Sequence, residues 1–308
     1  MIQPRAERRP LALVAILVTV LLWGSSGVLI KMATTTGLVT ALYRLWFAIP
    51  LLWTTAAMPS VRARLDRDWL RGSLVGGTLF GLHQILFFSG LKLTTVTDIN
   101  IIGALQPVLV LWVARSLFGE RATARAAVWS LAAVVGAAFV VVGAMGTPTW
   151  SAAGDTLAVV NLFAFTAYFL ASKRIRERTD AWTYVLGMTT VAGCVMLAAC
   201  LATGQQLGSP RPGDWVILIA IAILPGTLGH VLMNWAHAYV SAFAISMMLL
   251  GVPIVGAGAA AAVLGEHVTG LQLFGGALVL LAIANVVLRM DPRAAGELAE
   301  SAAETDAP

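Results

Sequence analysis

The stretch TDINIIGALQPVLVLWVARSLFGE, residues 97–120, is an apolar run of membrane-spanning length that Pro107 interrupts and a Gly-Glu pair ends. A second stretch, LGVPIVGAGAAAAVLGE at residues 250–266, repeats this arrangement with Pro253 in the place of Pro107. The proline and the final glutamate of the second stretch both follow their counterparts by 146 residues. Similarity at that separation is too long-range for a solenoid and is typical of a duplicated half, so the sequence predicts two related repeats.

The composition indicates a membrane protein. Of the 308 residues, 59% are hydrophobic and 11% are charged, whereas soluble domains carry about 25% charged residues. The net charge of +5 comes from basic residues in short gaps between apolar runs, which is a topology signal and not a nucleic-acid-binding one. No metal-ligand spacing, nucleotide-binding motif or nucleophile elbow occurs. We therefore expect a lipid bilayer and a small-molecule substrate as partners, with no nucleic acid, no cofactor and no metal.

The apolar runs divide the chain into ten segments. Backbone groups in hydrocarbon must be hydrogen-bonded within their own segment, so each run is predicted to be a helix. Residues 11–145 form the predicted first repeat and residues 154–289 the second, and an odd number of helices in each repeat makes the two inverted. The predicted fold is an all-α integral membrane protein, with transmembrane helices at 11–30, 38–58, 72–91, 96–118, 126–145, 157–172, 182–203, 215–236, 240–264 and 268–288.

Basic residues predict the orientation. With the N-terminus in the cytoplasm, sixteen of the 20 lysine and arginine residues fall on the inside. Lys31, Lys92 and Arg211 fall outside, and Arg44 lies within the second segment. This bias predicts a multi-pass protein with both termini in the cytoplasm. Residues 1–10 then form a cytoplasmic N-terminus, and the polar, alanine-rich residues 291–308 a disordered cytoplasmic tail.

Polar side chains inside membrane spans are costly unless they face a partner or a watery cavity, so each is a candidate for the binding site. His230 and Asn234 share one helix face, and Gln84 lies 146 residues before His230. The competing interpretation is hydrogen bonding between helices or ordinary aromatic packing. The predicted substrate-binding residues are Trp23, Tyr43, Trp46, His83, Gln84, Asn100, Asn161, Phe165, Tyr168, His230 and Asn234.

Titratable groups and prolines suggest further roles, each with an alternative. His83, His230 and Asp98 are candidates for proton coupling, although Asp98 also fits the start of a helix, where the helix dipole favours an acid. Arg44 either snorkels to the membrane surface or binds a substrate carboxylate. Pro107 and Pro253 each remove a backbone hydrogen bond, which fits either a hinge or a fixed kink.

The chain resembles a known family. Trp23-Gly24-Ser25 with Lys31, Pro107 with Gly119-Glu120, Pro253 with Gly265-Glu266, and Gly154-Asp155 resemble the EamA-type, ten-helix branch of the drug/metabolite transporter (DMT) superfamily. This resemblance implies a carrier of the bacterial inner membrane, often an exporter of amino acids. It also implies a basket in which helices one to four and six to nine surround a central cavity, with helices five and ten outside.

The function expected is therefore export of amino acids or similar small metabolites by alternating access. The protein is expected to be a monomer or a weak homo-oligomer and not an enzyme. An exporter or facilitator of lipophilic cations or drugs is the alternative, since aromatic walls suit such substrates. A membrane-embedded lipid enzyme is a rival of another class, but the sequence has no paired carboxylates near the end of a span.

Overall fold

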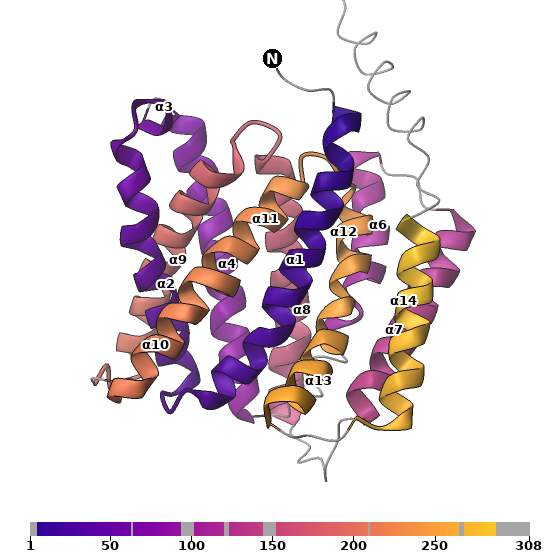
Figure 1. The fold of residues 1–308 in the computed structure, drawn as a ribbon. Coiled ribbons are helices and arrows are strands. Elements are labelled where there is room, and N and C mark those ends of the chain that lie inside the picture. The colour runs from indigo at the N-terminus through magenta and orange to yellow at the C-terminus, as the bar shows by residue number, and fades with distance from the viewer. Residues whose placement is uncertain are drawn as a thin grey trace, which may run out of the picture.

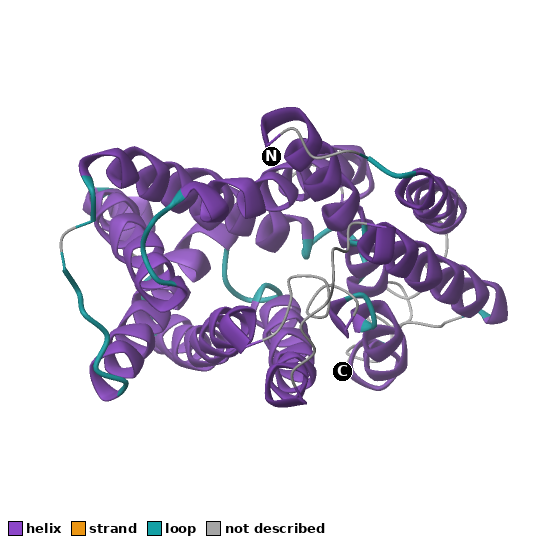
Figure 2. Cartoon of the chain, turned by 90° about the horizontal axis from the view of Figure 1, so that it is seen from below, coloured by secondary structure: helices purple, strands orange, loops and turns teal. Residues whose placement is uncertain are grey.

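A computed structural model describes residues 5–62, 64–93, 102–119, 123–143, 152–208, 210–264 and 268–287. These residues are almost entirely helical and contain no strand (Figure 1, Figure 2). Seven helical stretches within them are long and apolar enough to cross a membrane, and two further apolar helices are shorter. The described part of the chain is thus an α-helical membrane protein, as the sequence predicts.

The helices of the two repeats follow the predicted order. In the first repeat they are α1 (Arg5–Met32), α2 (Gly37–Thr54), α4 (Arg67–Leu93), α6 (Gln106–Phe118) and α7 (Ala124–Gly143), with the short η1 (Thr55–Ala57) and α3 (Pro59–Arg62) between α2 and α4. In the second repeat they are α8 (Ala152–Ile175), α9 (Ala181–Ala202), α10 (Pro212–Ile221), η2 (Ala222–Leu228), α11 (Gly229–Ala236), α12 (Ala242–Leu249), α13 (Gly251–Leu264) and α14 (Gly270–Val287). α10, η2 and α11 run consecutively as one span.

Contacts between the repeats occur in related pairs. Helix α1 packs against α11 and α13, and its counterpart α8 packs against α4 and α6. In the first repeat, α4 and α6 are the equivalents of α11 and α13 in the second. The contact of α1 with α11 therefore corresponds to that of α8 with α4, and the contact of α1 with α13 to that of α8 with α6. Such reciprocity is expected of two repeats related by a pseudo-two-fold axis.

Helices α7 and α14 pack mainly on each other and lie at one side of the bundle (Figure 1). Two glycines permit the contact, because a Cβ on Gly275 would lie 2.5 Å from the carbonyl oxygen of Gly136. A Cβ on Gly136 would lie 2.8 Å from the carbonyl oxygen of Gly275. Small residues that let backbones approach are the usual basis of helix packing in membranes. This placement agrees with the outer position implied for the fifth and tenth helices.

Two spans are interrupted at equivalent places. The fourth span turns at Ala104 and Leu105 before α6, and the ninth turns at Leu250 between α12 and α13. Pro107 and Pro253 each lie in the first turn of the helix that follows, where a missing N–H costs little. The interruption thus precedes each proline. A third irregularity is the π-helix η2, which contains Pro225.

Candidate functional site

Arg44 of α2 connects the two repeats inside the bundle. Its Nη1 donates to Oε1 of Gln84 at 3.1 Å, and its Nη2 lies 2.7 Å from Nε2 of His230. Arginine only donates hydrogen bonds, so Nε2 of His230 accepts here and the ring proton is on Nδ1. Gln84 and His230 are the pair that the 146-residue offset relates. One guanidinium therefore joins equivalent positions of the first and second repeats.

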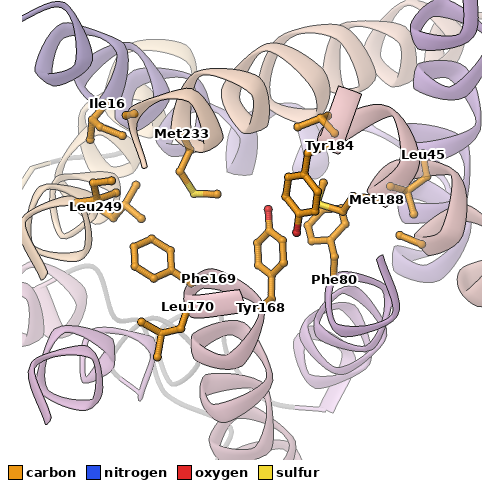
Figure 3. Close-up of a cluster of buried hydrophobic side chains, with 14 of the residues drawn as sticks. Ile16, Leu45, Phe80, Tyr168, Phe169, Leu170, Tyr184, Met188, Met233 and Leu249 are labelled. Carbon is orange, nitrogen blue, oxygen red and sulfur yellow. The ribbon is translucent and has the colours of Figure 1, made fainter. Parts of the chain in front are cut away.

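Tyr168 and Asn234 extend this network. The Tyr168 hydroxyl lies 3.5 Å from Nδ1 of His230 and accepts from Nδ2 of Asn234 at 3.5 Å. Asn234 also donates to the backbone carbonyl of His230 at 2.8 Å, while its own Oδ1 is buried without a hydrogen-bond partner. Figure 3 shows Tyr168 extending from its helix into the interior, between Phe169 and Phe80. The network thus contains a buried acceptor that is not used.

Aromatic rings surround the polar groups. The Phe80 ring lies 4.7 Å from His230 and 4.9 Å from Tyr168, and the Arg44 guanidinium lies 5.9 Å from its centre. Trp23 packs on His230 at 4.8 Å and donates from Nε1 to the carbonyl of Pro225 at 3.0 Å. Sequence reasoning missed Phe80, although it lies three and four residues before His83 and Gln84, on the same helix face. We call Arg44, Gln84, His230, Tyr168, Asn234, Phe80 and Trp23 the Arg44 cluster.

A second polar contact lies close by, between α4 and α8. Nδ1 of His83 is 2.7 Å from Oδ1 of Asn161, and the Phe165 ring packs on His83 at 4.7 Å. The His83 and Tyr168 rings are 6.5 Å apart, so this contact adjoins the Arg44 cluster. Arg44, His83 and Phe165 are half-buried rather than buried. Some surface of each therefore stays accessible.

Two predicted residues lie apart from this group. Tyr43 packs on Phe47 and Trp215, at 5.6 Å from each. Trp46 is 47% exposed and donates to the carbonyl of Gly193 at 3.3 Å. Successive residues of a helix turn by about 100°, so the neighbours of an inward-facing Arg44 point elsewhere. No ring contact or hydrogen bond links Tyr43 or Trp46 to the Arg44 cluster within the described ranges. Asp98, Asn100, Glu120 and Glu266 lie outside the residues that the structure describes.

Charge is unbalanced within the bundle. Among the described residues no carboxylate pairs with Arg44, and the ion pairs Arg64–Asp180 at 3.1 Å and Arg174–Glu177 at 3.2 Å lie at helix ends. The same residues contain no group of histidine, cysteine or acidic side chains that could hold a metal ion. The cluster offers a cation, neutral hydrogen-bonding groups and aromatic faces. Such an arrangement is suited to binding a small polar molecule.

Basic side chains border the cluster beyond the end of α8. Nε of Arg176 donates to the backbone carbonyl of Asn234 at 2.8 Å, and burial lowers the pKa of Arg176 to about 10. His237 is buried against the Phe169 ring at 4.6 Å. Burial, together with the positive charges of Lys173 and Arg176, holds the pKa of His237 well below its ordinary value of 6.5. His237 is therefore neutral in the fold at neutral pH.

Comparison with known proteins identifies the family. The model of the EamA-like transporter family matches residues 10–142 and 152–288. A solved structure, titled only as the crystal structure of a protein, is similar in fold with a TM-score of 0.76 and 20% identity, over 91% of this chain and 97% of that one. A search of curated proteins finds no match. The two matched segments cover most of the chain, one for each repeat. The chain belongs to the EamA-like transporter family, within the drug/metabolite transporter superfamily.

Proposed function

We propose that the protein exports amino acids or similarly small, zwitterionic metabolites by alternating access of its two repeats. The observation that carries this proposal is the convergence of Arg44, Gln84, Tyr168 and His230 from α2, α4, α8 and α11. Polar groups inside a membrane protein are costly and mark substrate pathways. Their origin in both repeats matches the usual place of transporter sites, at the interface between repeats.

The accessible surface of Arg44, His83 and Phe165 supports a central cavity next to the cluster. The interruptions before Pro107 and Pro253 support hinges at equivalent places in the two repeats, because a broken helix bends with less loss of hydrogen bonding. Rocking of one repeat against the other about such points would expose the cluster to each side in turn. Binding and movement would then involve the same inter-repeat contacts.

The chemistry of the cluster supports a zwitterion over a lipophilic cation. The rings of Phe80, Tyr168 and Trp23 suit either class of substrate. Arg44, however, repels a cation, and no described carboxylate offsets its charge. The sixteen-to-three bias of basic residues supports cytoplasmic termini. The bacterial inner membrane and the outward direction of transport are proposed from the family resemblance. We propose transport without catalysis, since the family is one of carriers.

The test is uptake of a panel of labelled amino acids into proteoliposomes containing the purified full-length protein, with and without a pH gradient. Protein-free liposomes give the background. We expect saturable uptake of at least one amino acid. Uptake that is equal with and without the pH gradient would contradict proton coupling through His83, His230 or Asp98, but it would not contradict the transport function. Uptake of quaternary ammonium compounds with no amino-acid flux would contradict the substrate class.

A further inference from the structure

Arg44 is a half-buried cation within a membrane span, and the two hydrogen-bond partners of its guanidinium are neutral. Two of its five N–H groups have partners in the described structure, the amide of Gln84 and the imidazole of His230. Its Nε is buried without a hydrogen-bond partner. A guanidinium away from water normally pairs with an anion, because neutral acceptors replace only part of its hydration. The Arg44 guanidinium therefore lacks the anionic partner that such a group normally has within a membrane protein.

The free donors suit one class of ligand. The planar guanidinium presents parallel N–H groups that match the two oxygens of a carboxylate. The donor without a partner is Nε–H, since both hydrogen-bond partners are on the Nη atoms, and Nε is buried beside η2, where a Cβ on Gly226 would lie 3.3 Å from it. Arg44 as a whole is half-buried, so a small ligand can reach part of its surface, although Nε itself is covered. Phe80 beneath the guanidinium supplies an apolar wall that limits competition from water.

We propose that Arg44 binds the carboxylate of the transported substrate and so restricts transport to molecules that carry one. This proposal rests on the transport function proposed above. Arg44 has no cationic counterpart in the other repeat, because α9, the helix equivalent to α2, contains no basic residue. The carboxylate is therefore bound in one orientation, beside the pair formed by Gln84 and His230.

The opposite charge of a zwitterion has a place in the same cluster. Oδ1 of Asn234 is a buried acceptor without a partner, and an ammonium group is a donor that fits it. Asn234 and Arg44 contact His230 at different atoms, the backbone carbonyl and Nε2 respectively. Asn234 is thus the acceptor of the cluster that is assigned to the ammonium group, and Arg44 the donor assigned to the carboxylate.

Three matched series of probes test the carboxylate requirement. They are phenylalanine, leucine and alanine, each with the amine that lacks the carboxylate and the acid that lacks the amino group. Binding is measured by the shift in thermal unfolding of the purified full-length protein in detergent, and uptake in proteoliposomes. We expect the amino acids and the acids to bind and the amines not to bind. Arg44→Gln should weaken the binding of acids and amino acids by about 10- to 100-fold, and Arg44→Lys should restore part of it.

Arg211→Gln is the matched control. It removes the same charge from an exposed residue at the start of α10, so its binding should equal that of the natural protein. Equal binding of carboxylates by Arg44→Gln would overturn the role of Arg44 and leave the transport function standing. If the acids bind and none of the amino acids binds, the role of Arg44 in carboxylate binding would stand, but the amino-acid substrate class would be wrong. Amines carried in preference to acids, or no probe bound at all, would overturn the inference.

Discussion

The two repeats make the same contact with different chemistry. Between α4 and α8, Nδ1 of His83 meets the side chain of Asn161 at 2.7 Å. Between α1 and α11, the Thr19 hydroxyl lies 3.2 Å from the backbone carbonyl of Gly229 and also bonds the carbonyl of Ala15 in its own helix at 2.9 Å. Thr19 precedes Asn161 by 142 residues and Gly229 follows His83 by 146, the two offsets at which the repeats align. Helix packing is thus shared by the repeats, whereas the side chains that can recognise a ligand are not.

This difference separates residues that maintain the scaffold from those that define the substrate. Scaffold positions come in reciprocal pairs, such as Gly136 and Gly275. The candidate binding groups are single, since Arg44 has no basic equivalent in α9. A change to a scaffold position should therefore lower stability. A change to a binding group should lower transport while leaving the fold intact.

The largest effect on stability is expected at the contact between α7 and α14. Gly275→Ala would place a methyl group 2.5 Å from the carbonyl oxygen of Gly136, so the helices must separate. We expect the free energy of unfolding to fall by about 2 kcal/mol, measured by thermal unfolding in detergent. Gly276→Ala is the control, because its methyl group would meet Ile254 at an ordinary 3.7 Å. Equal stability of the two variants would show that close backbone approach does not hold this pair.

The next effect compares the two equivalent polar contacts. Asn161→Leu removes the partner of His83 beside the Arg44 cluster, and we expect uptake to fall about tenfold, equivalent to about 1.4 kcal/mol. Thr19→Val should change uptake less than about twofold, because its hydroxyl serves helix packing worth about 0.6 kcal/mol. Uptake at limiting substrate measures both. Equal losses of uptake in the two variants would contradict the idea that one contact serves substrate binding and its equivalent serves helix packing.

A smaller, pH-dependent effect is expected at His237, whose counterpart at the same offset is Leu91. Burial and the nearby cations lower the pKa of His237 in the fold, so the unfolded chain takes up the proton first. The stability that neutral His237 contributes to the fold is fully present above about pH 6.5 and is lost as the pH falls below that value. When the pH falls from 7 to 6, the free energy of unfolding of the natural protein should therefore decrease more than that of His237→Leu. The difference between the two decreases should be less than about 1 kcal/mol. Parallel pH profiles of thermal unfolding would contradict this assignment.

The smallest effect is expected at Trp23, where Trp23→Phe keeps a ring on His230 but removes the hydrogen bond to the carbonyl of Pro225. Because the ring contact with the cluster is kept and only a helix-packing hydrogen bond is lost, we expect unchanged uptake and a loss of about 0.6 kcal/mol in stability. Phe165, which follows Trp23 by 142 residues, has no such bond to lose. Phe165→Leu should instead affect uptake, through its contact with His83. Thermal unfolding and uptake of both variants distinguish the two outcomes.

Much of the fold could be predicted, because backbone groups in hydrocarbon allow few alternatives to a helix. The 146-residue offset relates Gln84 to His230, and the structure shows Arg44 in contact with both. It could not show which face of α2 points inward, since that helix is apolar on most sides. Tyr43 and Trp46 therefore lie apart from the cluster, and Arg44 between them lies within it. Phe80 was missed because its side chain does not stand out in an apolar helix, and only its spacing from His83 and Gln84 marks it.

The most direct test is the position of a bound substrate analogue. A crystal structure with 4-bromophenylalanine would locate the bromine by its anomalous scattering and the carboxylate by its density. We predict the carboxylate against the Arg44 guanidinium and the ring beside Phe80 and Tyr168, with no such density in Arg44→Gln. Occupancy away from the Arg44 cluster, unchanged in Arg44→Gln, would contradict the account.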